Sequence, residues 1–332
     1  MPTISTSKAL WYISPGRAEL REELLSAPAS GEVLVCAMYG AISRGTERLV
    51  HSGWVPTSEF SRMRAPLMAG EFPFPVKYGY ATVGRVESGP PELSNRLVFC
   101  LHPHQDRFIL PASMALPTPQ NVPPARAVLA ANMETALNAV WDGAPGPADR
   151  IAVIGGGVVG LLVAYLCARL PGAEVTVVDI VSARADLARS MGARFALPDA
   201  APVDCDLVFH ASASSAGLAT ALRLAGEEAS VVELSWYGIG DVAAPLGEAF
   251  HSRRLRLLSS QVGMVASSHR TRWSRTRRLA AALALLGDAR LEALLGAPIA
   301  FEELPAKLSA VLSADTAAVC PLIRYPAADQ SR

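Results

Sequence analysis

The chain has 332 residues, of which 51% are apolar and 18% are charged, and its 30 Lys and Arg residues balance its 30 Asp and Glu residues. The apolar content and the zero net charge exclude a mainly disordered chain, and the neutral balance disfavours a general nucleic-acid coat protein. At about 150 residues per domain, the length predicts two domains, each large enough to bury its own core.

The N-terminus and the cysteines predict a cytoplasmic protein. The segment from Met1 to Lys8 is polar and lacks the apolar core of a secretory signal. The longest apolar run, Ile151 to Leu170, contains four glycines and lacks the flanking charges of a membrane span. The five cysteines are scattered without a Cys-x-x-Cys pair, so we expect reduced, buried thiols at Cys36, Cys100, Cys167, Cys205 and Cys320.

The first 125 residues have a β-rich pattern of short apolar runs separated by Gly and Pro. We expect strands at 33–38, 82–86 and 96–100. The next segment, 125–141, has a helical pattern, and 143–147 is rich in Gly and Pro, which predicts a loop.

After this loop, strand and helix patterns alternate. The expected strands are 151–154, 174–178, 206–209, 229–234 and 255–258, and the expected helices are 158–170 and 182–191. Strands that alternate with helices require right-handed crossovers, which place helices on both faces of a parallel sheet. The predicted fold class is therefore α/β, with a Rossmann-type, doubly wound parallel sheet beside a β-rich domain.

A glycine motif opens this second region. Gly155-Gly-Gly157-Val-Val-Gly160 matches G-x-G-x-x-G and stands between a predicted strand and a predicted helix. In a dinucleotide-binding motif, Gly155 makes the tight turn, Gly157 lets the backbone approach a pyrophosphate, and Gly160 lets helix and strand pack closely. The helix start at Val158 and Val159 offers unpaired N–H groups to the phosphate. We therefore predict a dinucleotide site; the alternative is a Rossmann domain that binds nothing.

Asp179 follows the next predicted strand and is the candidate ribose-binding residue. A carboxylate there can hydrogen-bond both ribose hydroxyls, and its charge repels a 2′-phosphate. The sequence therefore favours NAD over NADP. Arg184 tempers this preference, because a nearby Arg can accept that phosphate, although it can equally flank the adenine.

The order of these parts resembles the medium-chain dehydrogenase/reductase superfamily, which is related to the zinc-type alcohol dehydrogenases. Segments that fall at the family's landmarks are Gly31-Glu-Val-Leu-Val35, Gly79 with Gly84, Arg96-Leu-Val98, Thr135-Ala-Leu137, the glycine motif and Phe301-Glu-Glu-Leu304. The resemblance covers nearly the whole chain. It implies a GroES-like catalytic domain (1–125 and 296–332) split by a Rossmann domain (126–295), and a homodimer.

Several segments are similar to the bacteriochlorophyllide dehydrogenase branch of that superfamily, which oxidises a hydroxyethyl side chain on a chlorin ring. These segments are Ala41-Ile-Ser-Arg-Gly-Thr-Glu-Arg-Leu49, Ser52-Gly53, Phe74-Pro-Val-Lys-Tyr-Gly-Tyr80, Phe250-His-Ser-Arg-Arg254 and Ser259-Ser-Gln-Val-Gly263. The similarity implies a bulky ring substrate as one candidate. It leaves the substrate open, because similar sequences of unassigned activity occur in the superfamily.

The chain departs from the family at the zinc ligands. The three ligand positions hold other residues here, namely Ser43 or Arg44, Tyr80, and Ala131 or Asn132. Zinc needs thiolate, imidazole or carboxylate ligands in a tetrahedral arrangement, and this set does not supply them. The four-cysteine structural lobe of the family is missing too. We therefore expect a zinc-free protein.

Without zinc, the oxygen of an alcohol/carbonyl pair needs another positive or hydrogen-bonding partner. We hypothesise that Tyr80 or Thr46 donates to this oxygen and that Arg44 contributes charge. Glu47 is a candidate to orient Arg44 or to relay the proton. The alternatives are that Glu47 and Arg48 form ion pairs in a turn and that Tyr80 is a packed aromatic.

Other side chains near this region are further candidates. His51, His102 and His104 can act near neutral pH, although an unpaired His in a loop usually lies on the surface, which is what we expect here. The aromatic segment Trp54 to Pro75 predicts a lid over a flat substrate, or else a cover for the core or for a dimer partner.

Two further residues are candidate cofactor contacts. Trp236, with Tyr237 beside it, follows a predicted strand, and ligands of open α/β sheets bind at the carboxyl ends of strands. The alternative is that both aromatics pack at a domain seam. Thr135, at a family landmark, is the other candidate.

The charge balance hides a basic stretch, because residues 249–287 hold eight arginines and no acidic residue. We expect a solvated helix face, whose positive charge is balanced by acidic residues elsewhere on the surface. The alternative is an electropositive rim that attracts an anionic substrate.

Together these features predict an NAD(P)-dependent oxidoreductase of the medium-chain type that interconverts an alcohol and a carbonyl without zinc. One alternative is a quinone or enone reductase, in which the cofactor delivers hydride to a conjugated carbon. The other is a non-catalytic nucleotide-binding protein. The expected partners are small molecules, with no nucleic acid and no membrane.

Overall fold

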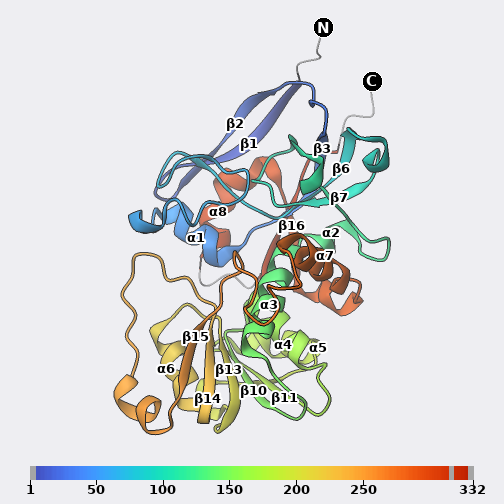
Figure 1. Ribbon diagram of the computed structural model, residues 1–332. Coiled ribbons are helices and arrows are strands. Elements are labelled where there is room, and N and C mark those ends of the chain that lie inside the picture. The colour runs from blue at the N-terminus through green and yellow to red at the C-terminus, as the bar shows by residue number, and fades with distance from the viewer. Residues whose placement is uncertain (1–4, 314–317, 328–332) are drawn as a thin grey trace. The chain divides into compact units, whose positions relative to one another are not determined.

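The computed structural model describes residues 5–313 and 318–327, which cluster into two compact units (Figure 1). Unit 1 comprises Met1–Ala131, Leu286–Asp288 and Leu295–Arg332. Unit 2 comprises Asn132–Leu285 and Ala289–Leu294. The chain therefore starts in unit 1, builds unit 2 and returns. The domain bounds expected from the sequence, 1–125 with 296–332 and 126–295, stay a prediction.

Unit 1 contains a four-stranded antiparallel sheet in the order β2–β1–β5–β4. Its strands are β1 (Ser5–Ser14), β2 (Arg17–Leu25), β4 (Ala69–Gly70) and β5 (Val76–Lys77). Gly16, with φ of +74°, lies in the tight turn between β1 and β2, where the left-handed backbone favours glycine. Tyr12 of β1 is fully buried, and this sheet thereby carries a phenol into the core of unit 1.

The second sheet of unit 1 has the strand order β16–β17–β3–β6–β7–β9, and β8 pairs with β3. Its strands are β3 (Glu32–Ala41), β6 (Thr82–Ser88), β7 (Leu97–Cys100), β8 (Arg107–Pro111), β9 (Leu116–Pro117), β16 (Leu295–Ala300) and β17 (Cys320–Arg324). The strands expected at 33–38, 82–86 and 96–100 are confirmed as β3, β6 and β7. Distant parts of the chain meet here, because β17 pairs antiparallel with β3.

Short helices complete unit 1. The α-helices are α1 (Arg44–Ser52), α2 (Pro124–Ala127) and α8 (Leu304–Leu312), and the 3₁₀ turns are η1 (Thr57–Glu59), η2 (Pro91–Leu93), η3 (Ala112–Met114) and η8 (Phe301–Glu303). Helix α1 ends at Gly53, whose φ of +70° lets its N–H reach the carbonyls of Leu49 and Val50. Because α1 directly follows β3, it holds the candidate residues Arg44, Thr46 and Glu47 at the end of the sheet.

Unit 2 is built on a parallel sheet in the order β12–β11–β10–β13–β14–β15. Its strands are β10 (Arg150–Ile154), β11 (Glu174–Val178), β12 (Arg194–Ala196), β13 (Cys205–His210), β14 (Ala225–Glu233) and β15 (Arg256–Ser259). The expected strands of this region are confirmed, with β14 starting earlier than expected.

The helices of unit 2 are α3 (Ala130–Gly143), α4 (Val158–Cys167), α5 (Ala185–Ser190), α6 (Ser215–Leu224) and α7 (Arg275–Leu285), with the shorter turns η4 (Ser182–Arg184), η5 (Pro198–Ala200), η6 (Leu246–Phe250) and η7 (Ala289–Leu294). Of these, α4, α5 and α6 contact the sheet. Figure 1 shows α6 on one side of the sheet and α4 with α5 on the other. The predicted doubly wound α/β sheet is therefore confirmed.

Two of the expected helices are divided. The helix expected at 125–141 consists of α2 and α3, separated by the fully buried residues Val128 and Leu129. The helix expected at 182–191 is η4 followed by α5. Periodicity alone did not reveal these breaks, because the apolar spacing continues across them.

The central strands β10 and β13 form the core of unit 2. Their residues are buried along almost the whole of both strands, because helices cover both faces of the sheet. The apolar run 151–170 thus forms β10, the glycine turn and α4, and among the described residues no helix is long and apolar enough to cross a bilayer. All five cysteines are buried free thiols, as expected.

Arg278 of α7 differs from the expected solvated face. Its side chain is only 1% exposed, and its guanidinium donates to Glu134 Oε1 at 3.0 Å and to Asn138 Oδ1. It also donates to the carbonyls of Val262 and Met264. This arginine therefore ties α7 and the loop before it to α3. The exposed part of the basic stretch includes Arg275 and Arg277 of α7, which lie on the expected solvated helix face, and Arg270 and Arg272, which precede the helix.

Replacing Arg278 should destabilise the fold strongly. The substitution Arg278→Met leaves the Glu134 carboxyl buried without its guanidinium, and breaking a buried pair in this way costs about 3–5 kcal/mol. Urea denaturation measures the free energy of unfolding. Arg275→Met, on the exposed face of the same helix, should change it by less than about 0.5 kcal/mol. Equal losses in the two variants would contradict the role of the buried pair.

Candidate functional site

The glycine turn after β10 is held by close backbone approaches. Gly155 has φ of +105°, and its N–H donates to the Val178 carbonyl at 2.8 Å. A Cβ on Gly155 would lie 2.9 Å from the Ser212 nitrogen. A Cβ on Gly160 would lie only 1.9 Å from the Gly155 carbonyl oxygen, so α4 packs directly on the turn. Both positions require glycine for steric reasons.

Gly157, in contrast, faces open space. It is the N-cap residue of α4 with an ordinary φ of −74°, and a Cβ there would have no other heavy atom within 4 Å. Val158 and Val159, which follow it in the first turn, are half-buried, whereas Gly155 and Gly160 are buried. The start of α4 is therefore open on the side where its unpaired N–H groups lie, as a phosphate-binding turn requires.

Asp179 and Arg184 both bind the glycine turn. The Asp179 carboxylate accepts the N–H of Gly156 at 2.6 Å and the N–H of Val181 at 2.8 Å. Arg184 Nη1 donates to the Gly156 carbonyl at 2.6 Å, and its Nε lies 4.0 Å from Asp179 Oδ2. The acid at the end of β11 is thus fixed beside the turn, with an arginine next to it.

The order of the strands indicates where unit 2 would bind a ligand. β10 has β11 on one side and β13 on the other, so the connections run in opposite directions from this point. In open α/β sheets, ligands bind outside the carboxyl ends of the strands at such a switch point. The glycine turn and Asp179 lie at these ends. Of the other cofactor candidates, Thr135 lies in α3 and Trp236 in the loop after β14, and both are half-buried.

In unit 1, Tyr80 lies with two hydroxyl side chains at the start of α1. Burial raises the pKa of Tyr80 to about 12, although hydrogen bonds with the side chains of Ser43 and Thr46 act in the opposite direction. The phenol is therefore protonated at neutral pH and can act as a hydrogen-bond donor. The structure thus brings together Tyr80 and Thr46, the two residues that the sequence predicts as donors.

Glu47 is the buried centre of this region. Its carboxylate accepts the Tyr12 hydroxyl at 2.7 Å and the Ser43 N–H at 2.8 Å. His104 Nε2 lies 2.9 Å from Glu47 Oε2 and must donate, because a carboxylate only accepts. Gly79, with φ of +123°, packs against the His104 ring, where a Cβ would lie 2.8 Å from Nε2. Three donors therefore fix Glu47.

Arg44 has a different environment from the one expected. Its guanidinium donates to the carbonyls of Ser313 and Ala318, which come from the return segment of the chain. Arg44 and Glu47 therefore reach toward different partners, although both belong to α1.

The expectation that these three histidines lie on the surface is wrong. The exposed fractions of His51, His102 and His104 are 6%, 5% and 0%. Burial lowers the pKa of His51, and it lowers the pKa of His102 to about 3, so His102 is neutral and stacks on Phe108. His104 is buried as well, but its ring bonds to Glu47, a partner 57 residues away in the sequence. No local sequence signal identifies such a distant partner.

The aromatic segment Trp54 to Pro75 packs partly into unit 1. Phe72 is buried and contacts Phe60 and Tyr78, with ring centroids 5.7 and 5.9 Å apart. Tyr78 in turn packs edge-on against Tyr80 at 6.0 Å. A continuous aromatic row therefore runs from this segment to the candidate phenol, whereas Trp54 is 48% exposed.

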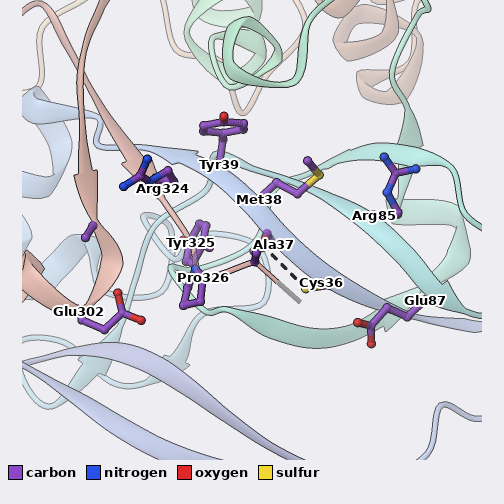
Figure 2. A pocket seen from close by; sticks show the side chains of 12 residues that line it. Cys36, Ala37, Met38, Tyr39, Arg85, Glu87, Glu302, Arg324, Tyr325 and Pro326 are labelled. Atoms are coloured by element: carbon purple, nitrogen blue, oxygen red, sulfur yellow. Dashed lines mark hydrogen bonds between the residues drawn. The ribbon is translucent and has the colours of Figure 1, made fainter. Parts of the chain in front are cut away.

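A separate hollow of about 770 Å³ lies on the large sheet of unit 1 (Figure 2). Figure 2 shows Arg324 and Glu302 on one side of it and Arg85 and Glu87 on the other. Met38 of β3 is among the other lining residues. None of the sequence-predicted site residues lines this hollow.

The residues present do not fit a zinc ion. Within residues 5–313 and 318–327, no three side chains of His, Cys, Asp or Glu gather as a metal-binding group. Two of the positions that correspond to zinc ligands, Ser43 and Tyr80, carry hydroxyl side chains. Neutral hydroxyls are not the thiolate, imidazole or carboxylate ligands of zinc sites. The absence of zinc stays a prediction.

Comparison with solved structures identifies the fold. A protein from Sinorhizobium meliloti 1021, assigned as a zinc-binding dehydrogenase and bound to NADP, matches with a TM-score of 0.78 and 19% identity, covering 96% of this chain and 99% of that one. L-idonate 5-dehydrogenase from Escherichia coli matches with a TM-score of 0.78 and 15% identity, covering 97% and 99%. A short chain alcohol dehydrogenase from Escherichia coli CFT073, in complex with NADH, matches with a TM-score of 0.77 and 17% identity, covering 96% and 99%.

These likenesses show that the chain has the same fold as these dehydrogenases. No protein-family model matches the sequence, and no curated protein matches it.

Two glycine substitutions should separate folding from nucleotide binding. Gly160→Ala places a Cβ against the Gly155 carbonyl, and overpacking of this kind costs about 1–3 kcal/mol. Gly157→Ala meets no neighbour, so its thermal midpoint should match the wild type, while its NADH affinity should fall about tenfold because the methyl group occupies the open side of the turn. Thermal melts and fluorescence titration measure the two effects. Unchanged NADH affinity in a folded Gly157→Ala variant would place the nucleotide elsewhere.

Proposed function

We propose that the chain is an NAD(P)-dependent oxidoreductase that interconverts an alcohol and a carbonyl without zinc. The observation that carries this proposal is the open glycine turn of α4, with Asp179 beside it, at the switch point of the parallel sheet. Structures with the same fold whose names include a bound NADP or NADH support it.

The turn fits a dinucleotide. Gly157, Val158 and Val159 would hold the pyrophosphate with backbone N–H groups, and Asp179 would accept the ribose hydroxyls. Thr135 and Trp236 are proposed as further cofactor contacts. A bound nicotinamide supplies hydride transfer. We propose NAD as the preferred cofactor, because the Asp179 carboxylate repels a 2′-phosphate, although Arg184 next to it reduces that repulsion.

In unit 1, Tyr80 is the proposed partner of the substrate oxygen. Its raised pKa keeps the phenol protonated, so it donates a hydrogen bond to the carbonyl oxygen, on which negative charge develops during reduction. In the direction of alcohol oxidation, the substrate hydroxyl donates to Tyr80, and the Tyr80 proton passes to the hydroxyl of Thr46. Because Thr46 is only half-buried, this proton can continue to solvent.

Glu47 and Arg44 act as positioning residues in this proposal. Glu47 fixes the Ser43 backbone at the start of α1 and thereby the hydroxyls beside Tyr80. Arg44 holds the return segment through the carbonyls of Ser313 and Ala318. A flat, bulky ring substrate is proposed as one candidate, since the aromatic row ends at Tyr80, where a substrate ring could extend it.

A homodimer is proposed as well. β15 is the edge strand of the parallel sheet, and its side chains are exposed along the strand, with Leu257 at 40% and Leu258 at 39%. An exposed apolar edge strand of this kind pairs readily with a second strand.

The central experiment offers the purified chain NADH or NADPH with a panel of alcohols, quinones and enones. Turnover of an alcohol/carbonyl pair should persist in a chelator, and Tyr80→Phe should lower kcat about 100-fold because the donor to the developing oxyanion is lost. Tyr78→Phe, which removes the neighbouring buried hydroxyl, is the matched control and should retain activity.

Each other outcome selects an alternative. Turnover of quinones or enones alone indicates a conjugated-carbon reductase. Thermal stabilisation by NADH without any turnover indicates a nucleotide-binding protein. One equivalent of zinc in the active protein, with loss of activity in the chelator, would overturn the zinc-free mechanism.

The cofactor preference should depend on the charge of Asp179. Asp179→Asn removes the charge while keeping the shape, so the affinity for NADPH should rise relative to NADH by about tenfold. Asp186→Asn, on the exposed face of α5, is the control and should leave the ratio unchanged. Calorimetric titration with both cofactors measures the ratio, and an unchanged ratio in Asp179→Asn would remove Asp179 from the ribose site.

A further inference from the structure

His210 lies between a carboxylate and a hydroxyl at the carboxyl ends of β13 and β14. Its Nδ1 is 2.6 Å from Glu233 Oε2, and its Nε2 is 2.7 Å from Ser212 Oγ. The imidazole side chain is fully buried, Glu233 is 14% exposed, and Ser212 is half-buried. An acid, a base and a hydroxyl therefore stand in line, and the mechanism proposed above uses none of them.

The carboxylate fixes the direction of these hydrogen bonds. Burial alone would raise the pKa of Glu233, but hydrogen bonds from His210 and Ser235 hold it below its usual value, so the group is an anion at neutral pH. Because an anionic carboxylate only accepts, Nδ1 of His210 carries a proton, and in the neutral imidazole Nε2 is then the acceptor. The Ser212 hydroxyl must then donate to Nε2. This is the arrangement in which a histidine acts as the base for a serine.

The carboxylate is itself held in place by further donors. The Ser235 N–H donates to Glu233 Oε1 at 2.7 Å, and the Tyr237 hydroxyl donates to Oε2 at 2.9 Å. With both oxygens bound, Glu233 cannot turn away from His210. The imidazole therefore has a single orientation, with Nε2 toward Ser212.

Ser212 lies at the N-terminal end of α6, where the helix dipole favours negative charge. A Cβ on Gly217 would lie 2.0 Å from Ser212 Oγ, so the hydroxyl is against the first turn of this helix. Ser214, the N-cap residue, accepts the Gly217 N–H and lies 3.0 Å from Ser212 Oγ. The N–H groups of the first turn, at the exposed residues Ser215 and Ala216, have no intrahelical acceptor.

We propose that Ser212, His210 and Glu233 form a nucleophilic centre that hydrolyses small, activated carboxylic esters. The positive end of α6 would stabilise the negative charge that develops on the carbonyl oxygen of the ester. The centre borders the glycine turn, since a Cβ on Gly155 would lie 2.9 Å from the Ser212 nitrogen.

The reaction balances with water as the only co-reactant. Ser212 Oγ forms a bond to the acyl carbon while its proton passes to His210 Nε2. The bond to the leaving alcohol breaks, and that proton goes to the leaving oxygen. Water, losing a proton to the same Nε2, then attacks the acyl carbon, and the carboxylic acid leaves as the proton returns to Ser212.

The decisive test uses the full chain without cofactor. A fluorophosphonate probe should add one equivalent to Ser212, located by peptide mass spectrometry, and the chain should release p-nitrophenol from p-nitrophenyl acetate. Ser212→Ala should abolish both signals. Thr220→Ala, which removes a hydroxyl further along α6, is the matched control and should keep both. An unlabelled Ser212 in the wild-type chain overturns the proposal whether or not any variant folds.

The acid and base have their own readouts. His210→Gln should lower the acylation rate about 100-fold or more, since general-base catalysis contributes on this scale. Glu233 and Tyr237 are the titratable groups that contact the imidazole. Glu233→Gln should therefore move the midpoint of the pH–rate profile to lower pH, because the imidazolium loses its stabilising anion. An unmoved midpoint means that Glu233 does not act through His210.

This activity requires no nucleotide, so its outcome is separate from that of the oxidoreductase. NADH binding without labelling of Ser212 leaves the dehydrogenase proposal intact and rejects the esterase. Labelling without NADH binding does the reverse.

Discussion

The contact between Gly160 and the Gly155 carbonyl is the constraint on which the glycine turn of unit 2 depends. It presses the start of α4 onto the end of β10 and leaves no space for a side chain. The turn can then receive Asp179 from β11 through the Gly156 N–H, and Ser212 from the end of β13 lies against Gly155. Three strand ends therefore converge on one turn because two glycines are in contact.

In unit 1, a buried carboxylate holds several elements together in a comparable way. Glu47 is fully buried and accepts donors from β1, from the residue before α1 and from the segment before β8. Each donor compensates part of the cost of burying the acid, so the acid is tolerated only while all three elements are in place. Tyr12, Ser43 and His104 are thereby fixed relative to one another, and Tyr80 packs beside them.

The sequence predicts what is local and misses what is distant. The glycine turn and the place of Asp179 beside it could be predicted because a turn, a helix start and a strand end follow one another within one βαβ unit. Tyr80 and Thr46 could be found through family landmarks. The surroundings of His104 and His210 could not, because their acids lie 57 and 23 residues away on other elements. A histidine in a loop sequence carries no sign of such a partner, so its burial was not foreseen.

At Gly217, the stability of helix α6 favours alanine, whereas the neighbouring hydroxyl cluster requires glycine. Within a helix, glycine is about 1 kcal/mol less favourable than alanine, since its backbone is freer in the unfolded chain. Alanine is nevertheless excluded at this position by the Ser212 hydroxyl, which occupies the space of its methyl group. The first turn of α6 is consequently less stable than it would be with alanine at this position. The N-cap hydrogen bond from the Gly217 N–H to Ser214 restores part of that loss. Gly217 thus lowers the local stability of the helix and lets the Ser212 side chain approach its first turn.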